Sequence, residues 1–163
     1  MGKRGYLYIG NSNDPRKGID YFSKLMGKLP NYAKGWIGSG PDIPNVPRIS
    51  EARQLTPEFM SEVAKQYDFF ISPSIADPNP TTILESMAWG FPVVCTPQSG
   101  YYETDYMRNI YLNDIAKSVT VLEELQYEDD QVLCLMADNA REKVISHYNW
   151  TKFTSIITKN LGL

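Results

Sequence analysis

The sequence predicts an α/β fold, in which a doubly wound parallel sheet is flanked by helices and the C-terminus is helical. Short apolar segments alternate with helical patterns from Tyr6 to Leu112, which favours strand–helix–strand units and parallel pairing. From Asp114 onward the apolar residues follow a helical period only. We therefore expect three helices to close the chain.

The size and charge of the chain suit a single domain. It has 163 residues, of which 42% are apolar, and this is enough for one sizeable core. The formal net charge of −3 and the lack of a basic run argue against an electrostatic nucleic-acid surface. No apolar run approaches the length that spans a membrane, and the first residues lack a signal-peptide pattern. A cytoplasmic location is therefore expected.

The cysteines and the histidine do not form a metal-binding pattern. Cys95 falls in an apolar strand and Cys134 in a helical pattern, far apart and without metal-ligand spacing, so both are expected to be reduced core residues. His147 is the only histidine, which excludes a multi-histidine metal site within this chain. Trp150, at the start of the last helical segment, is expected to be a core aromatic residue.

Six segments are predicted to be strands. The first is a continuous apolar run of the kind that parallel sheets bury on both faces, and the third is the weakest. The predicted strands are 6–10, 33–38, 48–52, 67–71, 92–95 and 109–112.

The helix boundaries follow from capping residues. Thr56 followed by Pro57 combines an N-cap with a proline at the first helical position. Asn79 followed by Pro80 predicts the same start for another helix, which Gly90 ends as a left-handed residue. The predicted helices are 19–27, 56–66, 80–89, 114–125, 130–146 and 150–161.

The turn after the first strand suits phosphate binding. It runs from Asn11 to Gly18, contains residues that tolerate unusual backbone angles, and leads into a helix N-terminus, which attracts anions. Lys17 lies near its end, with Arg16 as a neighbouring cation. Taken alone, Lys17 is either a phosphate ligand or a solvated loop charge.

The stretch from Ile71 to Glu103 carries the strongest functional signal. The helix within it has an apolar face and a polar face. The apolar face consists of Ile83, Leu84, Met87 and Ala88, and the polar face of Thr81, Thr82, Glu85 and Ser86. With Asp77 in the entry loop, the carboxylates of Asp77 and Glu85 can overlook one cleft at the carboxyl ends of the strands. The alternative is that Asp77 favours the helix start and Glu85 is solvated.

The order of residues around this helix resembles an enzyme signature. Seven residues separate Asp77 from Glu85, then Ser-Met-Ala-Trp-Gly-Phe-Pro-Val-Val follows, and later Ser99-Gly100-Tyr-Tyr-Glu103. Retaining glycosyltransferases of family four have Glu, seven residues, Glu-Ala-Met-Ala-x-Gly-x-Pro-Val-Val, and then Gly-Gly-x-x-Glu. These enzymes have the GT-B architecture of two Rossmann-like domains. The chain resembles their C-terminal, donor-binding domain, with Asp77 replacing a Glu and Ser99 replacing a Gly.

The resemblance implies roles for the charged residues of the site. Lys17, together with Arg16, would neutralise the diphosphate of a nucleotide-sugar donor as it leaves. Asp77 would hold the donor sugar, and Glu85 would accept hydrogen bonds from the ribose hydroxyls. The resembled enzymes generally need no metal, so no cofactor is expected.

The resemblance also implies a set of polar and backbone contacts to the donor. The backbone of Ser99 and Gly100 would add N–H donors for the developing charge. Asn11 stands where the family has an arginine, and an amide does not replace a guanidinium. The remaining residues expected to bind substrate are Gly10, Asn11, Thr81, Thr82 and Glu103.

The resemblance implies a partial enzyme, because the chain leaves no room for the family's N-terminal acceptor-binding domain. We therefore expect residues 1–163 to be one donor-binding domain of a hexosyltransferase of polysaccharide synthesis. The missing domain would bring it to the inner membrane face. Two alternatives remain, namely a catalytically silent nucleotide-sugar-binding or regulatory module and a nucleotide-sugar epimerase-like domain. A phosphorylase of this architecture would need a pyridoxal-phosphate lysine in a fitting context, which the sequence does not offer.

Overall fold

The structure, a computed structural model, describes residues 4–148 and 150–161. These ranges contain one sheet, six α-helices and two short 3-10 turns. The strands are β1 (Tyr6–Ile9), β2 (Lys34–Ile37), β3 (Arg48–Ser50), β4 (Phe69–Ser72), β5 (Val93–Cys95) and β6 (Met107–Asn109). The α-helices are α1 (Ile19–Gly27), α2 (Pro57–Val63), α3 (Thr81–Ala88), α4 (Ile115–Tyr127), α5 (Asp130–His147) and α6 (Trp150–Leu161). The predicted α/β class is confirmed.

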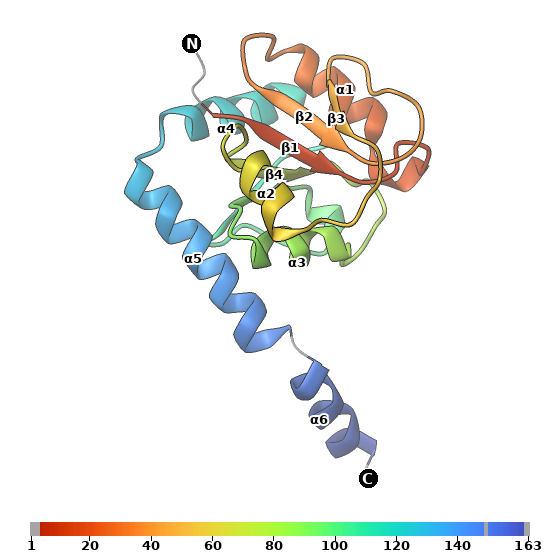
Figure 1. The fold of residues 1–163 in the computed structure, drawn as a ribbon, viewed down its shortest axis with the longest axis vertical. Coiled ribbons are helices and arrows are strands. Elements are labelled where there is room, and N and C mark those ends of the chain that lie inside the picture. Colours follow the sequence, from red (N-terminus) through yellow and green to blue (C-terminus); the bar gives the residue numbers. More distant parts are fainter. Residues whose placement is uncertain (1–3, 149, 162–163) are drawn as a thin grey trace.

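All strand pairs are parallel, and the strand order is β3-β2-β1-β4-β5-β6. The chain proceeds from β1 outward to β3, returns to the other side of β1 as β4, and continues to β6 (Figure 1). In the central pair, Tyr6 lies opposite Phe69 and Leu7 opposite Phe70. The order therefore reverses between β1 and β4. In doubly wound sheets this is the point at which ligands bind, beyond the carboxyl ends of the strands.

Helices cover both faces of the sheet (Figure 1). Side chains alternate across a strand, so neighbouring residues of β1 and β4 enter opposite cores. The core under α1 and α4 includes Tyr6, Tyr8, Phe22, Leu25, Met26, Trp36, Phe69, Ile71, Leu122 and Leu125. The core under α2, α3 and α5 includes Leu7, Ile37, Met60, Val63, Phe70, Ile83, Met87, Val93 and Ala140. Fully burying one such side chain contributes roughly 1.5–3 kcal/mol of stability, so these two cores fix the sheet edge that carries the site.

The C-terminal helices extend from the body of the domain. Helix α5 packs along α3 and then continues past it, and Figure 1 shows α6 at its far end, away from the sheet. The side chain of Trp150, which the sequence predicts as a core aromatic residue, lies outside the described residues. Over residues 4–148 and 150–161, no helix combines the length and the apolar character needed to cross a membrane.

The start of α3 differs from the prediction. Pro80 occupies the N-cap position with φ −63° and ψ 128°, and it makes no side-chain capping bond. Asn79, the predicted cap, instead has a left-handed backbone with φ 59°. Its side-chain oxygen accepts a hydrogen bond from the Tyr101 hydroxyl, so it does not cap the helix. The end of α3 is as predicted, because Gly90 has φ 82°.

Strand β6 lies closer to the N-terminus than the predicted 109–112. It pairs with β5 over Met107–Asn109, with Asn109 opposite Cys95. The Asn109 amide donates to the carbonyl oxygens of Cys95 at 3.0 Å and Tyr101 at 3.2 Å. The prediction was wrong because it followed the apolar Ile110, which is buried just after the strand, and did not foresee a satisfied polar residue within it.

The burial pattern of α3 and α5 corrects three predictions. Ser86 was predicted on the polar face of α3 but is buried, because α5 covers that side, while Ala88 is exposed. Cys95 is buried and free, as predicted. Cys134 is free but exposed, so its prediction as a core residue was wrong. The buried residues of α5 are Leu133, Met136 and Ala140, whose spacing places Cys134 on the other side of the helix.

Candidate functional site

Two loops meet at the switch point between β1 and β4. The backbone N–H of Ile75, in the loop after β4, donates to the Arg16 carbonyl, in the loop after β1, at 2.8 Å. Gly18 lies so close to Pro73 that a Cβ atom on it would be 2.0 Å from the Pro73 carbonyl oxygen. Gly18 also has φ 69°, so both the contact and the backbone angle require glycine. Close backbone contacts therefore help to hold the two loops together.

Lys17 and Asp77 form an ion pair across these loops. The Lys17 ammonium donates to Asp77 Oδ2, and the two side chains are only 20% and 17% exposed. Partial shielding from water strengthens such a pair relative to one on an open surface. An ammonium has three donors, and Asp77 is the one partner that the described residues give it. Lys17 can therefore bind an anion while it keeps Asp77.

Arg16 points to a different partner. Its guanidinium donates two hydrogen bonds to Asp14, at 3.0 Å and 2.7 Å, and its side chain is 64% exposed. The hydrogen bonds from Arg16 lower the pKa of Asp14 to about 2. Asp14 thus stays ionised at neutral pH and neutralises Arg16. Of the two adjacent cations, Lys17 is the one in contact with another predicted site residue.

A cleft of about 480 Å³ opens at the carboxyl ends of β1 and β2. Glu85 reaches it from α3, and Gly10 and Asn11 reach it from the end of β1. Its lining residues are Ile9, Gly10, Asn11, Ile37, Gly38, Ser39, Ala52, Arg53, Leu55, Glu85 and Trp89. The cleft combines an apolar wall with one carboxylate, as small-molecule sites do.

Glycines allow the backbone to pack tightly at the floor of this cleft. A Cβ atom on Gly10 would lie 2.4 Å from the hydroxyl of Tyr8, and one on Gly38 would lie 1.8 Å from the Gly10 carbonyl oxygen. The Tyr8 hydroxyl is buried and has no hydrogen-bond partner among the described residues. Burial raises the pKa of Tyr8 above its ordinary value, so the hydroxyl stays protonated. Larger residues at positions 10 and 38 would displace this floor.

Asn11 lines the cleft just after the end of β1. Its side-chain oxygen accepts a hydrogen bond from the backbone N–H of Asn13 at 2.9 Å, which closes an Asx turn. The side chain therefore shapes the loop that precedes Lys17. Arg53 is the cation that lines the cleft, and its guanidinium lies 4.3 Å from the centre of the Phe59 ring.

The other predicted residues lie at the start of α3 and in the turn after β5. Thr81 and Thr82 are the first residues of α3, where backbone N–H groups have no helical partner. Ser99 is buried, and Gly100 is exposed with φ 79°. The Ser99 carbonyl accepts from Asn79 N–H at 2.8 Å, which brings this turn against the start of α3.

The structure brings only some of the predicted site residues together. It brings Gly10, Asn11 and Glu85 into one cleft and pairs Lys17 with Asp77 at the adjoining loops. Asp77 does not line the cleft with Glu85, and Glu103 is exposed and also outside it.

Among the cleft-lining residues that the sequence did not predict as site residues are Trp89, Arg53 and Leu55. Trp89 lies four residues after Glu85, on the same side of α3, so helical spacing would have found it. Arg53 and Leu55 belong to the loop after β3, whose lack of periodicity gives no such signal. In the described part of the chain, no group of three or more His, Cys, Asp or Glu residues could hold a metal ion.

Comparisons with a family model and with a curated sequence both find glycosyltransferases. Residues 3–125 match a family model described as Glycosyl transferases group 1. A curated relative is the Escherichia coli UDP-Gal:alpha-D-GlcNAc-diphosphoundecaprenol alpha-1,3-galactosyltransferase, which is 30% identical over 96 residues. That match covers 55% of this chain and 24% of the relative, so the chain spans about a quarter of the curated relative. The matches are to transferases, and they favour neither the silent module nor the epimerase.

Solved structures share the fold. Anabaena HepE in complex with UDP is similar with a TM-score of 0.75 and 15% identity, over 98% of this chain and 49% of that one. The C-terminal domain of a Francisella tularensis group 1 family protein, LpcC, is similar with a TM-score of 0.66 and 16% identity. The match covers 91% of this chain and 88% of the LpcC domain. These similarities show a common Rossmann-like architecture. The share of the matched protein that this chain covers differs, at 88% for LpcC and 49% for HepE.

Proposed function

The chain belongs to the group 1 glycosyltransferase family, and we propose that it is the half of such an enzyme that binds the nucleotide-sugar donor. The observation that carries the proposal is the site at the β1–β4 switch point. There the ion pair of Lys17 and Asp77 adjoins the loop that enters the cleft holding Glu85. The positive charge of Lys17 suits a diphosphate, and the negative charges of Asp77 and Glu85 suit sugar or ribose hydroxyls.

The diphosphate of the donor lies at Lys17 and the start of α3 in this proposal. The ammonium keeps Asp77 and offers its remaining donors to phosphate oxygens. The unpaired N–H groups of Thr81 and Thr82, at the positive end of the α3 dipole, add to this attraction. The Arg16 guanidinium contributes to diphosphate binding only if it gives up its ion pair with Asp14. We therefore assign the main role in diphosphate binding to Lys17.

The nucleoside lies in the cleft. Glu85 accepts hydrogen bonds from the ribose hydroxyls, and the base packs between Arg53, Leu55 and Trp89. HepE was solved with UDP, and the Escherichia coli relative is named for UDP-Gal. Both support uridine as the base. The acidic pair of residues then flanks the donor, with Asp77 toward the sugar and Glu85 toward the ribose.

The reaction that we infer is transfer with retention, as the family-four signature implies. The bond from the anomeric carbon to the diphosphate oxygen breaks, and a bond to an acceptor oxygen forms on the same face. The acceptor hydroxyl gives its proton to the leaving diphosphate oxygen, and Lys17 with the nearby N–H groups stabilises the charge on that diphosphate. The acceptor-binding half lies in another domain, in line with the partial coverage of the relatives. The isolated chain therefore binds donor but transfers little sugar.

Calorimetric titration with UDP, GDP, dTDP and ADP tests this function. We expect UDP to bind selectively, because both named relatives point to uridine, and UMP to bind more weakly because it lacks the second phosphate. Adding EDTA should leave UDP affinity unchanged, since no metal is expected. If none of the four diphosphates binds at millimolar concentration, the proposal of a donor-binding domain fails for this chain.

A further inference from the structure

Asn79, which lies just before the N-cap residue Pro80 of α3, holds an unusual backbone conformation. Its φ is 59°, and among the described residues Asn45 is the other non-glycine residue with a positive φ. The left-handed region is unfavourable for an ordinary residue, and asparagine tolerates it better than most. A conformation of this kind persists where neighbouring groups hold it. The neighbours of Asn79 therefore decide the path of the chain into α3.

Two hydrogen bonds from one turn hold Asn79. Its backbone N–H donates to the Ser99 carbonyl at 2.8 Å, and its side-chain oxygen accepts from the Tyr101 hydroxyl. Between these two partners lies Gly100, where an added Cβ atom would be 3.5 Å from the Asn79 nitrogen. The turn 99–101 thus grips Asn79 at its backbone and at its side chain.

Tyr101 is itself firmly placed. The residue is 8% exposed, and its carbonyl oxygen accepts from the buried Asn109 amide at 3.2 Å. Its ring packs against Tyr148 at the end of α5, with ring centres 6.5 Å apart and planes at 59°. Tyr101 therefore joins strand β6 and the end of α5 to Asn79.

We propose that Tyr101 is a positioning residue for donor binding, and this rests on the proposed function. Its hydroxyl fixes Asn79, and through it Asp77 on one side and the N–H groups of Thr81 and Thr82 on the other. The diphosphate site then exists before the donor arrives, so binding does not have to order it. Removal of the hydroxyl leaves the ring in place and releases this loop.

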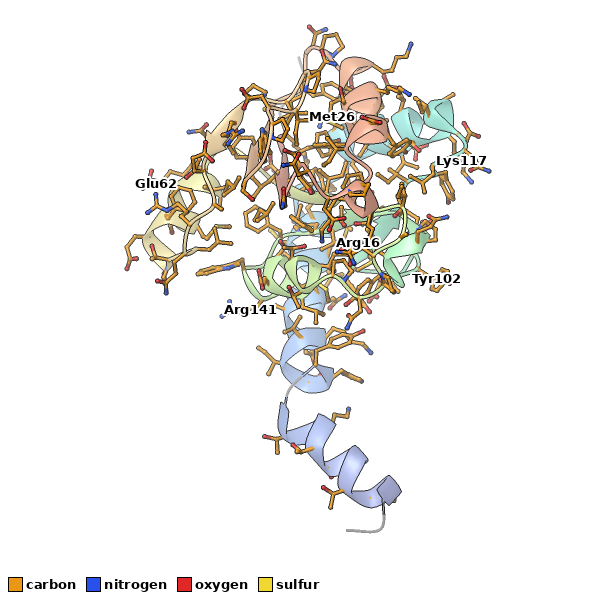
Figure 2. The ribbon with its side chains drawn as sticks, turned by 90° about the vertical axis from the view of Figure 1, so that its right-hand side faces the viewer. Arg16, Met26, Glu62, Tyr102, Lys117 and Arg141 are labelled. Atoms are coloured by element: carbon orange, nitrogen blue, oxygen red, sulfur yellow. The ribbon has the colours of Figure 1, made fainter. Side chains whose placement is uncertain are left out.

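The test uses a pair of variants that remove one hydrogen bond from either side. Tyr101→Phe deletes the hydroxyl, and Asn79→Gly deletes the side chain while still permitting a positive φ. Tyr102→Phe is the matched control, because the neighbouring Tyr102 is 70% exposed and lies at the outer edge of the body (Figure 2). Hydrogen–deuterium exchange of residues 77–83 reads the loop without any ligand, and calorimetry with UDP and UMP reads the site.

We expect faster exchange of residues 77–83 in Tyr101→Phe and Asn79→Gly, but not in Tyr102→Phe. UDP affinity should fall about threefold to tenfold in each single variant, in line with the loss of one hydrogen bond. UMP affinity should fall less than twofold, and the double variant should lose no more than either single one. A general loss of folding would instead weaken UDP and UMP alike.

Two results would overturn the proposal, and they are distinguishable from failure of the proposed function. Unchanged exchange of residues 77–83 in both single variants would show that the hydroxyl does not hold this loop. Faster exchange with unchanged UDP affinity would show that the loop is held but does not serve the donor. If the unaltered chain binds no diphosphate, the proposed function fails, and with it the donor role of Tyr101.

Discussion

Replacement of Lys17 by alanine is expected to weaken UDP binding by roughly 10- to 100-fold. The ammonium forms an ion pair with Asp77, and a charge-assisted hydrogen bond contributes about 1.5–3 kcal/mol, where 1.4 kcal/mol is tenfold in affinity. The change also leaves the Asp77 carboxylate without its partner, close to an incoming phosphate. UMP should lose less affinity than UDP, because the second phosphate accounts for the contact with Lys17. Calorimetry with both ligands measures the two losses.

Two further variants make this result specific. Arg16→Ala removes an adjacent cation that Asp14 already neutralises, so UDP affinity should change less than threefold. The double variant Lys17→Ala with Asp77→Asn should recover part of the loss, because it removes the unpaired carboxylate. Equal losses in Lys17→Ala and Arg16→Ala would contradict the specific role of Lys17 and point to general positive charge.

Replacement of Glu85 by alanine is expected to weaken UDP, UMP and uridine alike, by roughly 10- to 100-fold. All three ligands carry the ribose hydroxyls, which donate hydrogen bonds to Glu85 in the proposed complex, and hydrogen bonds to a charged group contribute about 1.5–3 kcal/mol. Folding should be unaffected, because Glu85 is exposed on α3. The measurement is calorimetry on the three ligands together with thermal unfolding.

A ligand lacking the hydroxyls provides the control for Glu85. The 2′,3′-dideoxy form of UDP should bind the unaltered chain and Glu85→Ala with nearly the same affinity. Glu124→Ala, an exposed carboxylate on α4, should leave UDP affinity unchanged. If Glu85→Ala weakens UDP but not uridine, the carboxylate acts at the phosphates or through α3, and the ribose assignment is wrong.

Much of the fold follows from local sequence signals. The sequence predicts α1 at its observed bounds, because an amphipathic segment begins after Gly18 and ends at Gly27. It predicts the α2 start through Thr56, whose hydroxyl accepts from the Phe59 N–H at 3.3 Å. Errors arise where tertiary contacts override local preference. Asn79 does not cap α3 because Tyr101, distant in sequence, captures its side chain.

The site is predictable only in part, for the same reason. Gly10, Lys17 and Glu85 follow from the turn and the motif, and the structure places them at the switch point. Arg53 comes from a loop without periodic pattern, so only the folded sheet edge shows that it lines the cleft. Asp77 pairs with Lys17 rather than sharing the cleft with Glu85, because the loop contacts at Gly18 and Ile75 set its position.

The most direct test of the donor-binding account is a map of amide chemical-shift changes as UDP is added to the ¹⁵N-labelled chain. We expect the largest changes in residues 10–18, 52–55 and 81–89, which surround the cleft and the Lys17–Asp77 pair. A contrasting position is available in the groove of about 440 Å³ that Arg4, Asp130 and Cys134 help to line. Changes concentrated in that groove, or no changes at saturating UDP, would contradict a donor site at the β1–β4 switch point.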